Sequence, residues 1–344
     1  MPSYPLPLPP HFDPARVGEL WCVPYEGLAA SAGEWARNHG IQPSTQDGER
    51  TCLLVVDAQN TFCLPGFELF VGGRSGHGAV DDMERLCRML YGNLGRVTQV
   101  VATLDTHQAY QVFHSALYVG PDGRPPKPMT QILVDDVRRG WWRVDPQVSL
   151  GPGQPSPSEL QAHLEHYVEE LAKRGRYHLT VWPYHAMLGG VGHALIPAVE
   201  AALFFHGQVR RCQPRLEMKG RNPLTESYSV LGPEVLTSKS PTGEVSVIGS
   251  HNETLIGYLL SFDRLLVAGE AASHCVAWTL EDLLNAIQER DASLASWVVV
   301  LKDCMSSVVV PGVVDYTKEA EEAFARFSQS GMRVLDSTDP RVWE

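Results

Sequence analysis

Cys275 is the residue of this 344-residue chain whose surroundings best suit nucleophilic chemistry. It follows an unbroken apolar run at residues 265–268, typical of a strand buried in a parallel sheet, and a turn of small residues at 269–273. From Val276 onward apolar residues recur at helical spacing, which predicts Cys275 at the first turn of a helix. The N–H groups and dipole of a helix start favour a thiolate and could hold an oxyanion. The alternative is a small buried hydrophobic residue, the usual role of a free cysteine.

Three further ionisable residues each follow a predicted strand: Asp57, Asp105 and Lys219. The carboxyl ends of parallel strands form one edge of a sheet, where functional sites are found. A carboxylate there could act as a general base. A lysine there is either a surface residue with a buried stem or a cation that tunes a neighbouring group. We therefore expect these side chains to meet Cys275 in one cavity.

A second set of residues has the composition of a metal site. Asp105 and His107 are two positions apart, so both side chains can face one cation. His185 follows a third predicted strand, at residues 177–185. Two histidines and one carboxylate suit Zn²⁺, Fe²⁺ or Mn²⁺ and leave coordination positions for substrate. Taken alone, the Asp-Thr-His motif could equally be a helix-capping aspartate beside a solvated histidine.

The elements that must position these residues alternate between strand and helix, which predicts an α/β fold with a parallel sheet. A turn-rich segment with its own helix interrupts this alternation at about 116–176, and we interpret it as an insertion. Residues 1–50 are rich in Pro, Gly and Ala and are interpreted as an N-terminal extension of a domain at 51–335. The six predicted strands lie at residues 51–57, 97–104, 177–185, 215–218, 265–268 and 297–301.

Composition excludes several classes of partner. The net charge of −12 argues against nucleic acid and against an anionic membrane surface, both of which attract basic patches. No apolar run is long enough to span a bilayer, and no secretory signal is visible. The seven cysteines form no CxxC pair. These features predict a reduced, cytoplasmic protein that acts on a small molecule.

The motifs, in their order along the chain, resemble those of the isochorismatase-like cysteine hydrolases, and within them the nicotinamidases. The resemblance implies a three-layer α/β/α fold with a central, mostly parallel six-stranded sheet of Rossmann-like type. It covers residues 51–335 and leaves the first 50 unmatched. The motifs are Val-Val-Asp57-Ala-Gln59-Asn60-Thr-Phe62, Asp105-Thr-His107, Trp182-Pro183-Tyr-His185, Lys219-Gly220 with Ser227-Tyr228-Ser229, and Gly269-Glu-Ala271-Ala-Ser-His-Cys275.

The resemblance also implies a role for each matching residue. It implies a catalytic triad, three metal ligands for one divalent ion, two aromatic residues that flank a flat ring, and an oxyanion hole of two backbone N–H groups. A cis peptide bond is implied before Ala271. Zn²⁺ is the favoured ion, with Fe²⁺ and Mn²⁺ as alternatives. The implied triad is Asp57, Lys219 and Cys275, and the implied metal ligands are Asp105, His107 and His185. The implied ring-flanking residues are Phe62 and Trp182, and the implied oxyanion-hole donors are the N–H groups of Ala271 and Cys275.

The predicted function is hydrolysis of nicotinamide or a related pyridine carboxamide to the acid and ammonia through a cysteine thioester. Three residues depart from the nicotinamidase pattern, namely Thr106, Ser273 and His274. They leave two alternatives: a related amidase or hydrolase with another small substrate, or a metal-pocket binding protein without turnover. A homo-oligomer is expected, and the first 50 residues or the insertion with its Trp141-Trp142 pair could form an interface or a lid.

Overall fold

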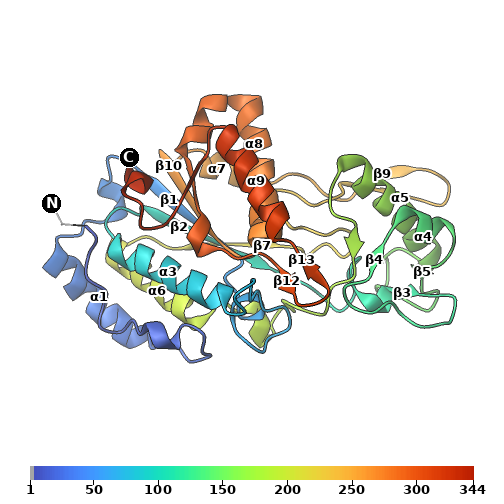
Figure 1. The fold of residues 1–344 in the computed structure, drawn as a ribbon, viewed down its shortest axis with the longest axis horizontal. Coiled ribbons are helices and arrows are strands. Elements are labelled where there is room, and N and C mark those ends of the chain that lie inside the picture. Colours follow the sequence, from blue (N-terminus) through green and yellow to red (C-terminus); the bar gives the residue numbers. More distant parts are fainter. Residues whose placement is uncertain (1–3) are drawn as a thin grey trace.

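The central element of the computed structural model, which describes residues 4–344, is a six-stranded parallel sheet (Figure 1). Every pair of neighbouring strands in it is parallel. In spatial order the strands are β14 (Arg333–Leu335), β11 (Val298–Leu301), β10 (Arg264–Gly269), β1 (Thr51–Val56), β2 (Gln99–Asp105) and β7 (Arg215–Lys219).

The sheet is covered on both faces because its central strands are apolar on both sides. In β1, Cys52 and Leu54 pack into one core and Leu53 and Val55 into the other. The first core lies under α7 (Glu253–Leu259), α8 (Ala277–Arg290) and α9 (Thr317–Gln329). The second lies under α3 (Gly78–Gly92) and α6 (Pro197–Arg210). This arrangement confirms the predicted three-layer α/β/α fold.

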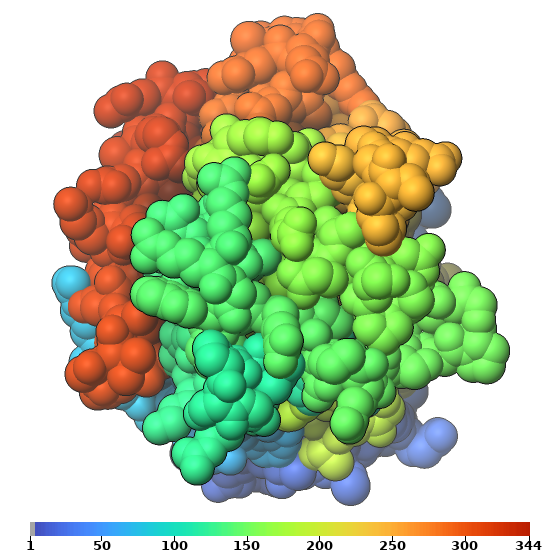
Figure 2. All heavy atoms as spheres, turned by 90° about the vertical axis from the view of Figure 1, so that its right-hand side faces the viewer, coloured from blue at the N-terminus to red at the C-terminus, as the bar shows by residue number. Residues whose placement is uncertain are grey.

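Residues 116–176 form a group of short elements at one end of the sheet, on the right of Figure 1. The longest is α5 (Pro157–Arg174), which begins with a capping box between Ser156 and Glu159 and ends at Gly175 in a left-handed conformation. Figure 2 looks onto this end of the molecule, and these residues cover much of that face. The remaining elements are β3 (Tyr118–Val119), β4 (Gln131–Ile132), α4 (Val134–Arg138) and β5 (Arg143–Val144).

The prediction of a sheet strand at residues 177–185 is wrong. Only β6 (Leu179–Thr180) is extended there, and it pairs antiparallel with β4, outside the central sheet. Leu179, Val181 and Trp182 are buried in one core with residues of the insertion, and Pro183 has no N–H to donate to a sheet. The sixth sheet strand is instead β14, a three-residue strand that begins with a charged residue and is only partly buried. Its pattern therefore gave no strand signal.

The N-terminal residues lie on the body of the molecule. α1 (Tyr25–His39) packs against α6, and Asp47 forms an ion pair with the buried Arg210. The division into an extension at 1–50 and a hydrolase domain at 51–335 stays a prediction. No helix within residues 4–344 has both the length and the apolar character needed to cross a membrane.

Candidate active site

The ammonium group of Lys219, at the end of β7, is the centre of the site. Its Nζ lies 3.0 Å from Asp57 Oδ2, 3.0 Å from Asp105 Oδ1 and 3.4 Å from Cys275 Sγ. It also donates a hydrogen bond of 2.9 Å to the carbonyl oxygen of Ser227. The three strand-end residues and the cysteine, which are distant along the chain, therefore meet as the sequence predicts.

Asp57 is held in place by its neighbours on two strands. It follows β1 with φ of 46°, a left-handed conformation that aspartate tolerates better than most residues. Its N–H donates to Thr103 Oγ1 at 3.0 Å, and the Thr103 hydroxyl donates to Asp57 Oδ1. Thr103 was not among the residues predicted from the sequence, although its place two residues before Asp105 on the same strand puts both side chains on one face.

Cys275 does not lie in the first turn of an α-helix, as the sequence predicted. It lies in a π-helical turn, Ala272–Val276, and α8 begins two residues later. The peptide bond between Glu270 and Ala271 is cis, as the resemblance implies. Among residues 4–344, the backbone N–H of Ala271 has no hydrogen-bond acceptor, so it can donate to a ligand.

Burial of Cys275 works against the thiolate that a helix start favours. Burial raises the pKa of the Cys275 thiol well above its ordinary value, and this outweighs the attraction of the Lys219 ammonium. Burial likewise raises the pKa of Asp57. Burial would lower the pKa of Lys219, but Asp105 and Asp57 raise it well above its ordinary value. These directions favour a protonated thiol beside an ammonium group and a carboxyl group that can accept the thiol proton.

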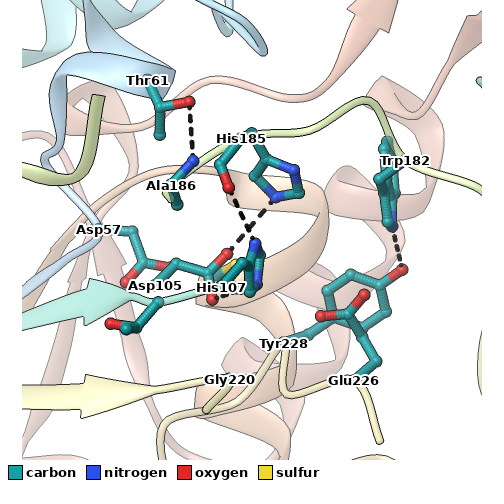
Figure 3. Close-up of polar contacts among 12 residues, drawn as sticks. Asp57, Thr61, Asp105, His107, Trp182, His185, Ala186, Gly220, Glu226 and Tyr228 are labelled. Carbon is teal, nitrogen blue, oxygen red and sulfur yellow. Dashed lines mark hydrogen bonds and ion pairs between the residues drawn. The ribbon is translucent and has the colours of Figure 1, made fainter. Parts of the chain in front are cut away.

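Asp105, His107 and His185 form a cluster whose ligand atoms all lie within 4.8 Å of one another. His107 Nε2 is 3.1 Å from Asp105 Oδ1, and His185 Nε2 is 3.6 Å from Asp105 Oδ2 (Figure 3). His185 does not come from a strand end. Its segment reaches the site through an isolated β-bridge between His107 and Met187. The structure thus brings together the three residues that the sequence predicts, by a different route for one of them.

The hydrogen bonds of the His107 and His185 rings favour tautomers that can bind a cation. His107 Nδ1 faces the carbonyl oxygen of His185 at 3.2 Å, and His185 Nδ1 faces that of Pro183 at 2.7 Å. A carbonyl oxygen only accepts, so each Nδ1 carries the proton and each Nε2 presents a lone pair to Asp105. His107 Nε2 is buried and lacks a hydrogen-bond partner within residues 4–344, and Asp105 Oδ1 has only its ion pair with Lys219. Two acceptors facing each other at 3.1 Å are stabilised by a cation between them.

Gly220 leaves the space that such a cation needs. It follows Lys219 with φ of 77°, and a Cβ atom there would lie 2.8 Å from Asp105 Oδ1 and 3.1 Å from His107 Nε2. Any other residue at this position would therefore crowd the ligand atoms. The donor set, the imidazole lone pairs and this cradle all fit one divalent ion, with zinc well suited to two imidazoles and a carboxylate.

Aromatic rings complete the site. Trp182 donates from Nε1 to the hydroxyl of Tyr228 at 3.0 Å, and the His274 ring is 5.5 Å from Trp182 and 5.3 Å from Tyr228. Burial lowers the pKa of His274 to about 3, so it is neutral. Phe62, in the short helix α2 (Asn60–Cys63), packs 5.6 Å from the His185 ring and belongs to the other core. Whether Phe62 and Trp182 flank one ligand ring stays a prediction.

Glu226 is a further carboxyl group that the sequence analysis did not single out. It is buried on the loop after β7, and Figure 3 places its side chain beside Tyr228, on the side of the site opposite Asp57. Burial, and then the negative charge of Asp105, raise its pKa well above the ordinary value. It precedes the Ser-Tyr-Ser motif, but one sequence offers no signal that this acid faces the site rather than solvent.

Comparison with known proteins identifies the fold. No protein-family model matches the chain, and no curated protein matches it in sequence. Among solved structures, the yeast nicotinamidase Pnc1p bound to the inhibitor nicotinaldehyde superposes with a TM-score of 0.50 at 15% identity, covering 83% of this chain and 99% of that one. A nicotinamidase/pyrazinamidase from Acinetobacter baumanii gives 0.48 at 20% identity, covering 86% and 99%. The yeast comparison establishes a shared fold, which agrees with the family resemblance noted in the sequence.

Proposed function

We propose that this protein is a metal-dependent cysteine amidohydrolase that converts nicotinamide or a related pyridine carboxamide to the carboxylic acid and ammonia. The observation that carries this proposal is the contact of one ammonium group with Asp57, Asp105 and Cys275 at 3.0, 3.0 and 3.4 Å. Through Lys219, the proposed nucleophile Cys275 and base Asp57 lie next to Asp105, a residue of the candidate metal site. The solved nicotinamidases with similar architecture support the substrate class.

The first half of the reaction forms a thioester. The Sγ–H proton of Cys275 passes to Asp57 while the sulfur attacks the amide carbonyl carbon. The raised pKa of Asp57 strengthens it as the base for this transfer. The carbonyl oxygen becomes an oxyanion that accepts from the N–H groups of Ala271 and Cys275, each donor contributing about 3 kcal/mol. The C–N bond then breaks, and ammonia leaves with the proton from Asp57.

The second half restores the enzyme. Water gives a proton to Asp57 and attacks the thioester carbonyl carbon, which releases the carboxylic acid. Asp57 returns the proton to the sulfur, while Lys219 stabilises the thiolate at 3.4 Å. Asp105, His107 and His185 would hold the ion, which when bound supplies a coordination position for the ring nitrogen. Trp182 would add apolar contact with the ring.

The test is ammonia release by metal-loaded protein. We expect turnover of nicotinamide, none by Cys275→Ala, and a lower kcat/KM for benzamide, which has no ring nitrogen. Metal-loaded, folded protein that releases no ammonia from nicotinamide or pyrazinamide would refute the assignment. The neutral His274 within the aromatic cluster favours one second candidate, an amidase of this fold that acts on a different small amide. A wider panel of primary amides separates the two.

A further inference from the structure

The free edge of the central sheet has the features of an interface. β7 is the last strand in the sheet, and within residues 4–344 only β2 pairs with it. An edge strand presents a row of unpaired N–H and C=O groups, which proteins usually protect with charged residues or a covering segment. Here Leu216 and Met218 are 54% and 50% exposed. Two large apolar side chains on an open edge indicate that another surface covers it.

A groove runs beside these side chains. It has a volume of about 740 Å³ and lies between β7 and α6, lined in part by Leu195, Leu203, Phe204, Pro214 and Leu216. Side chains alternate along a strand, so Met218 lies on the same face of the sheet as Leu216. Apolar side chains from a second surface at this edge would be buried in the groove.

The other face of β7 is charged and self-complementary. Arg215 and Glu217 form an ion pair with each other, and the Arg215 guanidinium lies 4.5 Å from the centre of the Tyr258 ring. The strand therefore presents a basic residue, an apolar residue and an acidic residue in succession. When two identical copies of the strand pair antiparallel, the basic residue of each copy can therefore lie opposite the acidic residue of the other.

The charges select one register for that pairing. A two-fold axis perpendicular to the sheet makes the two copies of β7 antiparallel and keeps equivalent faces on the same side. With the axis at Leu216, Arg215 of each copy lies opposite Glu217 of the other. With the axis at Arg215 or at Glu217, like charges lie opposite each other on the axis, which is unfavourable. With the axis at Met218, Glu217 of each copy would need Lys219 of the other as its partner. The Lys219 ammonium is already bound within the active site.

We propose that two copies of this chain form a two-fold dimer through β7, with antiparallel pairing centred on Leu216 and the groove beside α6 filled by apolar side chains of the second copy. The partner is a second copy rather than another protein because the charge pattern complements itself. This interface differs from the two that the sequence suggests, which are the N-terminal extension and the insertion. A dimer of this kind does not depend on the enzymatic activity, and the experiments below measure the molar mass of the protein in solution.

The first test compares Leu216→Lys with Trp141→Lys. Light scattering after gel filtration, at micromolar protein, should give a dimer for the wild type. Leu216→Lys places two lysines opposite each other on the axis and should raise the dimer dissociation constant about 100-fold. Trp141, 52% exposed on the insertion, is the matched control, and its substitution should leave the dimer intact. A monomeric wild type, or a dimer that only Trp141→Lys dissociates, would overturn the proposal.

The second test exchanges the charges and fixes the register. Arg215→Glu places glutamate opposite Glu217 of the second copy at two positions and should raise the dissociation constant about tenfold. The double variant Arg215→Glu with Glu217→Arg restores both opposite-charge pairs, so its constant should return to within about threefold of the wild type. Circular dichroism establishes that each variant is folded. A folded double variant that is as dissociated as the single one would exclude this pairing.

Discussion

The two halves of the site are built in different ways. Asp57, Asp105 and Lys219 stand at the ends of three adjacent strands, β1, β2 and β7. Hydrogen bonds of the sheet fix these strands relative to one another, and Lys219 Nζ lies 3.0 Å from a carboxylate oxygen of each aspartate. We refer to these three residues as the charged half of the site.

Trp182, Tyr228 and His274 form the aromatic half. They come from three segments outside the central sheet: the connection after β6, the loop after β7 and the π-helical turn before α8. Their contacts are ring packing at 5.3 to 5.5 Å and one hydrogen bond of 3.0 Å. The comparison indicates that the sheet fixes the groups of the proposed chemistry, while the loops shape the surface that a substrate contacts. Substitutions in the charged half should therefore affect kcat or metal affinity, and those in the aromatic half should affect KM.

Lys219→Met should give the largest effect. It leaves the buried carboxylates of Asp57 and Asp105 without their shared counter-ion, so the free energy of unfolding should fall by about 3–5 kcal/mol. The thiolate loses its stabilising charge, and kcat/KM should fall about 10⁴-fold. Urea denaturation and ammonia release measure the two effects.

Lys302→Met is the matched control, since Lys302 is exposed and its ion pair with Asp336, at 3.7 Å, is at the surface. It should change the unfolding free energy by less than about 1 kcal/mol and leave the activity unchanged. If Lys219→Met were as mild as this control, the charged half would not be the centre of the proposed chemistry.

Gly220→Ala should lower the affinity for the divalent ion about 100-fold, because its Cβ would lie 2.8 Å from Asp105 Oδ1. Calorimetric titration with Zn²⁺ in the presence of a competing chelator measures the affinity. Gly243→Ala provides the control: its φ is 88°, so the backbone strain is similar, but a Cβ there contacts nothing within 4 Å. Equal losses of affinity in the two variants would indicate a general effect of strain.

Glu226→Gln should weaken metal binding by about tenfold without removing a ligand. Burial and the charge of Asp105 raise the pKa of Glu226, and a divalent ion bound at Asp105 would lower that pKa again. Binding of the ion should therefore release the Glu226 proton, and the carboxylate that forms adds to the attraction for the ion. Glu244→Gln, on an exposed turn, should leave the affinity unchanged. An unchanged affinity in Glu226→Gln would mean that its carboxyl group does not contribute to the field at the ion.

The charged half could be predicted from the sequence because strand ends have a simple geometry. Asp105 and Lys219 end a strand and Asp57 and Cys275 follow one, and parallel strands bring their carboxyl ends to one edge. No comparable rule places residues on loops. His185 was predicted at the end of a sheet strand, yet it lies on a connecting segment. Its convergence with Asp105 and His107 was inferred from that strand end, and the family resemblance also implies it.

Burial and exact turn geometry also escape sequence reasoning. A helix start on its own favours a thiolate at Cys275, but the depth of the site raises the pKa of that thiol. The charge of Arg333 and the brevity of β14 concealed the sixth strand. The hydrogen bonds of Thr103 and the position of Glu226 depend on which loop folds over which strand, and a single sequence does not specify that.

Trp182→Phe and Tyr228→Phe should give the smallest effect and test the aromatic half directly. Each removes the same hydrogen bond, from Trp182 Nε1 to the Tyr228 hydroxyl at 3.0 Å, which is worth about 1 kcal/mol. Steady-state kinetics on nicotinamide should show KM raised about fivefold by either substitution, with kcat within about twofold. Because the bond is shared, the double variant should be no worse than either single variant. Additive losses in KM would mean that the two rings contact the substrate independently, whereas a loss confined to kcat would remove the distinction between the two halves of the site.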